Sequence, residues 1–405
     1  MNWYYYIVLV VILLQLFFCI QIYNNYRYVL NKYRKKRQGY MPEAVLIVPC
    51  KGLDLAFQKN ITSFFDQDYE NYSLWFVVED ESDLAYGELC RLEDQLSQNS
   101  KAHDVRVLIA GTGQYCSQKI HSLLYCYERI GDDVEVLAFA DSDVCVRSDW
   151  LSHIVYPLRK FKNGAASGYR WFIPKKNNLA SFALSAINAK IAQLLGNTHF
   201  NQAWGGSMAI RVDTFRQVGL DKIWPKVLSD DLSLSYAVKK AGRKVVFVPA
   251  CLVASYEVAT WRTLFEFGRR QFLITRVGAP KTWWFGLCSS LYSILGLWGG
   301  AGLAIYTAAI GGKNLSVFAA VPVIFFASQF FRAILRQKMI GKLLEEDLSK
   351  MRFAMAADII FFWVWSLLLL FFIISSAFGK TILWRGIRYR LSGPTETYIV
   401  NRAGN

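Results

Sequence analysis

The sequence has few of the residues that build metal clusters and disulfide frameworks. Its 405 residues include 8 cysteines and 4 histidines, and the cysteines form no C-x-x-C pair and have no neighbouring pair of histidines. Zinc sites and disulfide scaffolds both depend on such spacings, so the sequence indicates neither. We interpret the cysteines as free thiols in a reducing compartment.

Internal repeats and low-complexity linkers are also absent, and acidic residues are outnumbered. Lys and Arg total 46 against 31 Asp and Glu, which gives a formal net charge of +15. Such an excess can indicate nucleic-acid binding, but here the basic residues gather beside apolar segments, where anionic lipid headgroups attract them. We therefore expect a lipid bilayer as partner and no nucleic acid. The sequence does not indicate an oligomeric state.

Apolar residues are abundant, at 54% of the chain, and the first apolar run covers residues 3–22. As a helix this run is about 30 Å long, which matches the hydrocarbon core of a bilayer. No basic residue precedes the run and no small-x-small cleavage site follows it, which argues against a cleaved signal peptide. Residues 1–25 are therefore predicted to form an N-terminal transmembrane helix.

Further apolar segments lie near the C-terminus. Residues 283–333 are predicted to form a transmembrane hairpin, with spans at 283–310 and 315–331 and a tight turn at 311–314. A polar connection at 334–352 precedes residues 353–380, which form either a fourth transmembrane segment or a re-entrant one, and a tail at 381–405. The chain is thus expected to be a multi-pass integral membrane protein.

Basic flanks indicate how these segments are oriented. The first flank consists of Arg27, Lys32, Arg34, Lys35, Lys36 and Arg37. By the positive-inside rule it places the N-terminus outside, and the chain from residue 40 onward and the 334–352 connection in the cytoplasm. Four spans would then return the tail to the outside, whereas Lys380, Arg385, Arg388 and Arg390 favour an inside tail. From the span count we expect an outside tail.

Residues 41–257 have the pattern of a cytoplasmic α/β domain. Short apolar strands are predicted at 44–49, 74–78, 105–109 and 136–140, with helices between them at 56–65, 84–96 and 118–130. This alternation indicates a mostly parallel sheet. Ligands of such sheets bind outside the carboxyl ends of the strands, so the polar residues that follow each strand are candidate site residues.

Acidic residues follow three of the four predicted strands. The first strand is followed by Lys51 and Asp54, the second by Asp80, and the fourth by Asp141 and Asp143. Side chains at i and i+2 of an extended segment point the same way, so the last two could hold a divalent cation, which in turn could hold a diphosphate. Asp is also common in strand-to-loop turns, which is the plainer interpretation.

Two later motifs are candidates for the same site. Gly205 and Gly206 precede a short apolar strand, which indicates either close approach of the backbone to a ligand or only a tight turn. Asp230 and Asp231 precede a helical stretch at 232–241. Asp230 suits the N-cap of that helix, which leaves Asp231 free to face the ligand edge of the sheet.

An Arg-rich stretch with interleaved Phe and Trp links the α/β domain to the hairpin. Residues 258–282 are therefore predicted to contain a helix that lies in the membrane interface. Arg269 and Arg270 could add positive charge to the site or could extend only to lipid headgroups.

Taken together, the motifs resemble those of membrane-bound family-2-type glycosyltransferases, most closely the ceramide glucosyltransferase group, which also includes bacterial hopanoid glycosyltransferases. The motifs are Lys51-Gly52-Leu53-Asp54, Asn71-Tyr72 before Glu79-Asp80, Lys119-Ile120, Asp141-Ser142-Asp143, Gly205-Gly206-Ser207, Asp231 and the Arg-rich stretch. The resemblance implies a GT-A glycosyltransferase domain, a UDP-sugar donor, Mg²⁺ or Mn²⁺, and a membrane lipid acceptor.

The resemblance also implies roles for individual residues. Asp231 would be the catalytic base, and Asp141 and Asp143 would hold the metal. The residues expected to bind the nucleotide sugar are Lys51, Asp80, Lys119, Asp141, Gly205, Gly206, Arg269, Arg270 and Gln271. Lys119 could equally be a helix-surface charge. The Arg-rich motif lacks the Trp that ends it in processive polysaccharide synthases, which argues against that class.

The expected reaction is transfer of a hexose, glucose in the first instance, from a UDP-sugar to a lipid such as ceramide. One base on the face opposite the leaving group implies direct displacement with inversion at the anomeric carbon. The alternatives are a hopanoid or another lipid as acceptor, a polysaccharide synthase, and a non-catalytic membrane scaffold.

Overall fold

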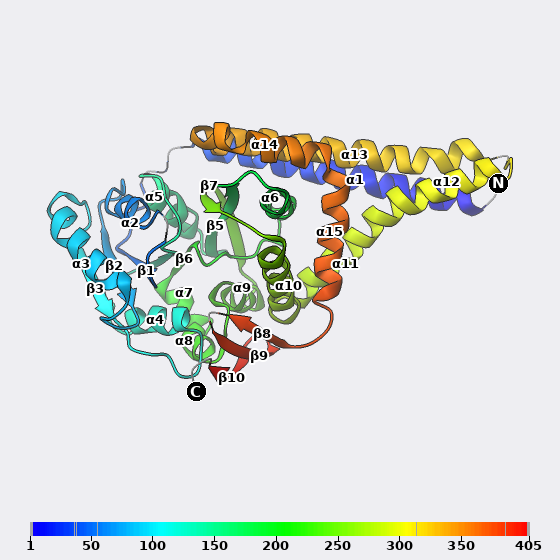
Figure 1. The fold of residues 1–405 in the computed structure, drawn as a ribbon. Coiled ribbons are helices and arrows are strands. Elements are labelled where there is room, and N and C mark those ends of the chain that lie inside the picture. The colour runs from blue at the N-terminus through cyan, green and yellow to red at the C-terminus, as the bar shows by residue number, and fades with distance from the viewer. Residues whose placement is uncertain are drawn as a thin grey trace.

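The protein consists of an α/β domain and a group of long helices that extend away from it (Figure 1). The computed structural model describes residues 3–35, 37, 39–54, 56–312, 314–384 and 386–402. Lys36, Lys313 and Arg385, which belong to the predicted basic flanks and turn, lie outside the described residues.

The α/β domain is built on a seven-stranded sheet of order β3-β2-β1-β4-β6-β5-β7. Its strands are β1 (Ala44–Pro49), β2 (Tyr72–Val78), β3 (Asp104–Ile109), β4 (Val136–Ala140), β5 (Asn163–Pro174), β6 (Ser207–Arg211) and β7 (Lys244–Glu257). The first four strands, all predicted, pair in parallel. The sheet as a whole is mixed, because β6 runs antiparallel to both β4 and β5.

Helices cover both faces of this sheet (Figure 1). They are α2 (Phe57–Phe65), α3 (Leu84–Leu96), α4 (Gln118–Tyr127), α5 (Trp150–Val155), α6 (Leu179–Ala192), α7 (Val212–Gln217), α8 (Leu220–Ile223) and α9 (Asp230–Lys240). Alternate side chains of a strand point to opposite faces, so Leu46 of β1 packs in the core beneath α2 and α3, while Ile47 packs in the core beneath α4. Helix α4 ends three residues before the predicted limit of 130.

Three helical segments are long and apolar enough to span a membrane, judged by length and composition. They are α1 (Trp3–Tyr33), the segment formed by α11 (Pro280–Ile294), a π-helical turn η4 (Leu295–Gly299) and α12 (Gly300–Ala309), and finally α13 (Leu315–Leu343). Helices α1 and α13 run parallel and side by side (Figure 1). The hydroxyl of Tyr5 donates to Asn314 near one end, and that of Tyr33 donates to the carbonyl of Leu343 at the other.

The predicted fourth span is a bent pair of helices. Helix α14 (Leu348–Ile360) and α15 (Phe362–Ser375) meet at an angle of 85°. Helix α14 packs against α6 of the α/β domain. Helix α15 alone is about 21 Å long, against a hydrocarbon core of about 30 Å. The geometry therefore favours the re-entrant alternative over a complete span.

The tail forms a small antiparallel sheet of β8 (Thr381–Trp384), β9 (Ile387–Gly393) and β10 (Glu396–Arg402). Its Ile382 and Tyr389 are buried together with Leu228, from the α/β domain, and Leu273 of α10 (Trp261–Gly278). The tail therefore lies beside the α/β domain (Figure 1), and the expected outside tail is wrong. The span count had treated the bent α14–α15 pair as one full crossing.

A buried ion pair joins α13 to α14. Arg336 donates two hydrogen bonds to Asp358, and both side chains are 1% exposed. We expect Asp358→Asn to lower the free energy of unfolding by about 3–5 kcal/mol, because it leaves a buried guanidinium without its counter-charge.

The matched control for this prediction is the double variant Arg336→Met/Asp358→Leu. It removes both charges, so most of the stability lost in Asp358→Asn should return. Thermal unfolding of the detergent-solubilised proteins measures both changes. Equal unfolding midpoints for wild type and Asp358→Asn would contradict the expected role of the pair.

Candidate active site

The topology brings four of the predicted motifs to one edge of the sheet. Strands β1 and β4 are parallel neighbours, so the residues that follow them, including Lys51 and Asp141, lie at the same edge. Strand β6 runs the other way, and its first residue, Ser207, pairs with Ala140 at the end of β4. Gly205 and Gly206, just before β6, therefore lie at that edge as well.

Lys119, in the first turn of α4, links two of the acids. Its Nζ lies 2.6 Å from Asp141 Oδ1 and 3.0 Å from Asp230 Oδ2. Burial alone would lower the pKa of Lys119, but these two carboxylates outweigh burial and hold that pKa above its usual value. Lys119 lines the central cavity, so its interpretation as a helix-surface charge is wrong.

The glycine pair is required by close packing around this ion pair. A Cβ at Gly205 would lie 2.4 Å from Asp230 Oδ2 and 2.7 Å from Lys119 Nζ, and a Cβ at Gly206 would lie 2.7 Å from Asp141 Oδ2. Neither glycine has a positive φ. The two glycines also form a tight turn, in which Ser207 N donates to the carbonyl of Trp204 at 3.0 Å, so the tight-turn interpretation fits the structure, and the close approach seen here is to protein side chains.

The start of α9 holds Asp231 against the glycine pair. The N-cap is Ser229, whose hydroxyl accepts a hydrogen bond from the backbone N–H of Leu232. The prediction that Asp230 is the N-cap is therefore wrong, because the serine hydroxyl already reaches the third N–H of the helix. Asp230 instead pairs with Lys119.

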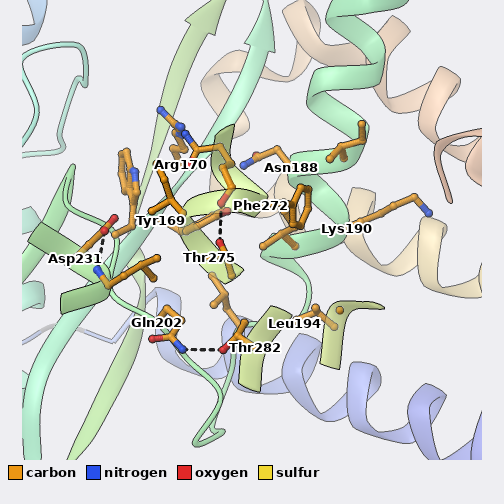
Figure 2. Close-up of a pocket in the computed structure, with 18 of the residues that line it drawn as sticks. Tyr169, Arg170, Asn188, Lys190, Leu194, Gln202, Asp231, Phe272, Thr275 and Thr282 are labelled. Atoms are coloured by element: carbon orange, nitrogen blue, oxygen red, sulfur yellow. Dashed lines mark hydrogen bonds between the residues drawn. The ribbon is translucent and has the colours of Figure 1, made fainter. Parts of the chain in front are cut away.

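Asp231 is fixed by three hydrogen bonds. Gly205 N donates to its Oδ2 at 3.2 Å, Leu232 N donates to its Oδ1 at 2.7 Å, and the hydroxyl of Ser229 also donates to Oδ1. A carboxylate has about four lone-pair sites, so one acceptor position remains for a substrate hydroxyl. Figure 2 shows Asp231 at one side of the cavity, across from Lys190.

Asp143 has the features of a cation ligand. Its Oδ1 is buried and has no hydrogen-bond partner among the described residues. Burial and the neighbouring Asp141 raise the pKa of Asp143 to about 6, and burial likewise raises that of Asp230 to about 6. An orphaned carboxylate oxygen beside a second carboxylate suits a hard divalent ion.

Few side chains are arranged to act as ligands of a metal ion. The described residues contain no group of three or more His, Cys, Asp or Glu side chains arranged to hold a metal. A divalent ion held by Asp141 and Asp143 would have to take its remaining ligands from other sources, and a diphosphate and water are ligands that Mg²⁺ commonly accepts.

Three predicted nucleotide-sugar residues, Asp80, Gly206 and Arg269, do not line the cavity. Asp80 is exposed, and hydrogen bonds from Ser82 lower the pKa of its carboxyl. Arg269 donates to the carbonyl of Phe378 at 3.2 Å. The cavity is lined by the remaining members, Lys51, Lys119, Asp141, Gly205, Arg270 and Gln271, and Gly206 lies directly beside Asp141. Lys51 also pairs with Glu79 at 2.8 Å.

Arg170 of β5 is a cavity residue that the sequence reading missed. Its guanidinium lies 4.5 Å from the ring of Phe172, 5.4 Å from that of Phe267 and 5.5 Å from that of Trp204. These rings hold the cation in the cavity (Figure 2), where its charge acts to lower the pKa of Asp143. An arginine within the apolar stretch 169–173 was the signal that could have revealed it.

One large cavity connects this edge to the long helices. Its volume is about 970 Å³, and its lining includes Asp141 and Asp231 at the sheet edge. It also includes Phe18 of α1, Tyr292 of α11 and Gln329 of α13. The volume lies at the upper end of the range for small-molecule sites, about 300–1,000 Å³.

The mixed sheet, the acidic pair behind β4 and the acid at the start of α9 are the arrangement that the resemblance to GT-A glycosyltransferases implied. The model for glycosyl transferase family 21 matches residues 7–396. The chain therefore belongs to that family, the ceramide glucosyltransferase family, which confirms the resemblance seen in the motifs.

Two solved structures are similar to the chain. A mannosyltransferase from Pyrobaculum calidifontis, in complex with GDP-Man and Mn²⁺, is 12% identical and has a TM-score of 0.43, over 91% of this chain and 97% of that one. GalNAc-T7 with UDP, GalNAc and Mn²⁺ is 13% identical and has a TM-score of 0.40, over 55% of this chain and 47% of that one.

Proposed function

We propose that the protein is an inverting glycosyltransferase that moves a hexose, glucose in the first instance, from a UDP-sugar to a membrane lipid such as ceramide. The observation that carries this proposal is the shared cavity. Asp231 and the basic residues of the sheet edge line the same space as residues of the long apolar helices. A polar donor and a lipid acceptor can therefore meet beside one carboxylate.

The sheet edge suits the diphosphate of the donor. Lys51, Arg170 and Arg270 bring positive charge to the cavity in addition to Lys119. Asp141 and Asp143 would hold Mg²⁺ or Mn²⁺, which would supply Lewis-acid stabilisation of the negative charge on the leaving group. Positive groups fixed in place before the reaction stabilise that charge without reorganisation, which is why their positions in the cavity matter.

Asp231 is placed to act as the general base. It would take the proton of the acceptor hydroxyl while the oxygen of that hydroxyl forms a bond to the anomeric carbon. The bond from that carbon to the phosphate oxygen breaks at the same time, and UDP leaves with the electron pair. A single displacement of this kind inverts the anomeric centre, by the reasoning that separates inverting from retaining glycosidases.

The membrane arrangement follows from the same proposal. The α1 helix, the α11–α12 segment and α13 would each cross the bilayer, and α15 would enter it and return. Three crossings place the α/β domain and the tail on one side, in agreement with their packing. By the positive-inside rule, the basic residues behind α1 would put that side in the cytoplasm.

The proposal is tested with the detergent-solubilised protein, a panel of labelled UDP-sugars and a total lipid extract. We expect one donor to label a single discrete lipid, and EDTA to reduce that label at least a hundredfold until Mg²⁺ or Mn²⁺ is restored. Comparison with pure ceramide and pure hopanoid standards identifies the acceptor.

Two outcomes of this assay would contradict the proposal. A ladder of products would indicate a polysaccharide synthase. Label that stays in the UDP-sugar for every donor, from a protein that still binds UDP, would indicate a non-catalytic scaffold.

A further inference from the structure

The end of the cavity farthest from the acids contains two cations that lack an acidic partner. Lys190 of α6 donates a hydrogen bond to the hydroxyl of Ser366 at 2.9 Å. Arg332 of α13 makes no hydrogen bond or ion pair with any residue of the described chain. Both side chains line the cavity.

No carboxylate in this region is free to neutralise these charges. Asp358 is already bound by Arg336 and also accepts a hydrogen bond from Gln337 at 2.6 Å. The acids that line the cavity, Asp54, Asp141, Asp143, Asp230 and Asp231, all lie at the sheet edge. Lys190 and Arg332 therefore leave an excess of positive charge at the other end.

The pairing of α1 with α13 shows at which level along the apolar surface of α1 Arg332 lies. The two hydrogen bonds between these helices join residues 309 and 310 positions apart, which places Arg332 level with residues 22–23 of α1. Exposed apolar side chains of α1 extend from Tyr6 to Tyr23, whereas the later Val29 is buried against the α/β domain. Arg332 thus lies where the apolar surface of α1 ends, at the depth of lipid headgroups.

A second, independent observation indicates a polar ligand in this part of the cavity. Gln15 of α1 is 1% exposed and lines the cavity, yet its Nε2 has no hydrogen-bond partner among the described residues. It lies about 10 Å farther along α1, toward the membrane centre, than the level of Arg332. A buried N–H without a partner is costly, so the site lacks an acceptor such as a carbonyl oxygen.

Without a bound anion, the positive charges of Lys190 and Arg332 are also energetically unfavourable. Burial lowers the pKa of Lys190 well below its usual value; the positive charges of Arg336 and Arg332 lower it further, and the negative charge of Asp358 offsets this only in part. A bound anion would act in the opposite direction and favour the charged form of Lys190. Charged side chains at membrane depth are rare and normally face a partner or a polar cavity.

We propose that Lys190 and Arg332 bind the anionic headgroup of a membrane lipid. The negatively charged group would lie between the two cations, and the carbonyl and acyl chains of the lipid would extend past Gln15 along the cavity. This site is separate from the acids that carry glycosyl transfer, and the inference does not depend on the proposed reaction.

The test uses the full-length protein in nanodiscs of phosphatidylcholine with a minor fraction of phosphatidylglycerol, and measures the retained lipids by native mass spectrometry. We expect the wild type to retain phosphatidylglycerol at least fivefold above its share of the bilayer. The double variant Lys190→Met/Arg332→Gln should lose this enrichment. Lys338→Gln, an exposed charge on the same helix, should keep it.

The thermal unfolding midpoint of the double variant shows whether it has lost only the binding site or its whole fold. Removing an uncompensated charge is expected to leave the thermal unfolding midpoint unchanged or raised, since replacing buried ions by apolar groups is often neutral or stabilising. If the double variant does not fold, Arg332→Gln alone should fold, because Arg332 makes no hydrogen bond or ion pair in the described chain, and it should still reduce the enrichment.

Three results would overturn the proposal. The first is a wild type without preference for the anionic lipid, and the second is a double variant that folds and keeps the preference. The third is displacement of phosphatidylglycerol by excess inorganic phosphate, which would make this a site for soluble anions instead of lipids.

Discussion

Asp231→Asn is expected to reduce kcat about a hundredfold to ten-thousandfold, the range that general base catalysis contributes. The asparagine side chain keeps an oxygen that can accept from Gly205 N or Leu232 N, so the start of α9 should stay in place. It cannot take a proton from the acceptor. UDP-sugar binding, measured by calorimetry, should therefore stay within a few-fold of the wild type while product formation falls.

The control for this variant is Asp132→Asn, which removes an exposed carboxylate in the turn after α4. Its turnover should equal that of the wild type. Turnover of Asp231→Asn within tenfold of the wild type would place the base elsewhere. Asp230 would then be the first alternative, since it lies in the same cavity and burial raises its pKa to about 6.

Gly205→Ala is expected to lower kcat/KM at least a hundredfold, which corresponds to about 2.7 kcal/mol of transition-state stabilisation. The added methyl group would lie 2.4 Å from Asp230 Oδ2 and 2.7 Å from Lys119 Nζ, closer than real Cβ contacts. The ends of the Asp230 and Lys119 side chains must then move, and Lys119 also pairs with Asp141. Steady-state kinetics with varied UDP-sugar measures the loss.

The matched control is Gly87→Ala in α3, where an added Cβ meets nothing within 4 Å. That substitution should leave kcat/KM unchanged and stabilise the helix by about 0.5–1 kcal/mol. Normal kinetics for Gly205→Ala would show that the backbone at residue 205 can move away from Asp230 at little cost. The glycine pair would then not be a requirement of the site.

The strands that the sequence predicts well are those with continuous apolar runs. Strand β4, Val136–Ala140, is entirely buried and was placed at its observed limits. Strand β5 was missed because its first half, with Asn163, Gly164 and Gly168, has the composition of a loop. That half is held as a strand by pairing with β6 and β7, which local sequence does not reveal.

The candidate site was predictable where its residues lie directly before or after a strand. Asp141, Asp143 and the glycine pair lie at the sheet edge because strand order alone places them there. The rotation of α10 was not predictable: Gly268 lets it approach Phe372 of α15, and this packing turns Arg270 into the cavity and Arg269 out of it. Tertiary contacts between distant segments decide which arginine can bind a phosphate.

The tail shows what hydropathy alone does not predict, namely how an apolar segment is bent and where the chain after it lies. The segment before it is apolar enough for a span, but it is bent by 85° between α14 and α15, as in a broken span or a re-entrant loop. The contacts that keep the tail near the α/β domain include those of Arg276 with the carbonyls of Ala377 and Gly379. These are interactions over about a hundred residues of sequence, and no local pattern predicts them.

The most direct test of the account is the linkage of the product. The lipid made from an α-linked UDP-sugar by the wild-type protein is purified, and its anomeric configuration is determined by NMR. Direct displacement with Asp231 as the only base predicts one hexose in β-linkage to a lipid hydroxyl. An α-linked hexose would contradict single displacement, and more than one hexose per lipid would contradict transfer of a single sugar.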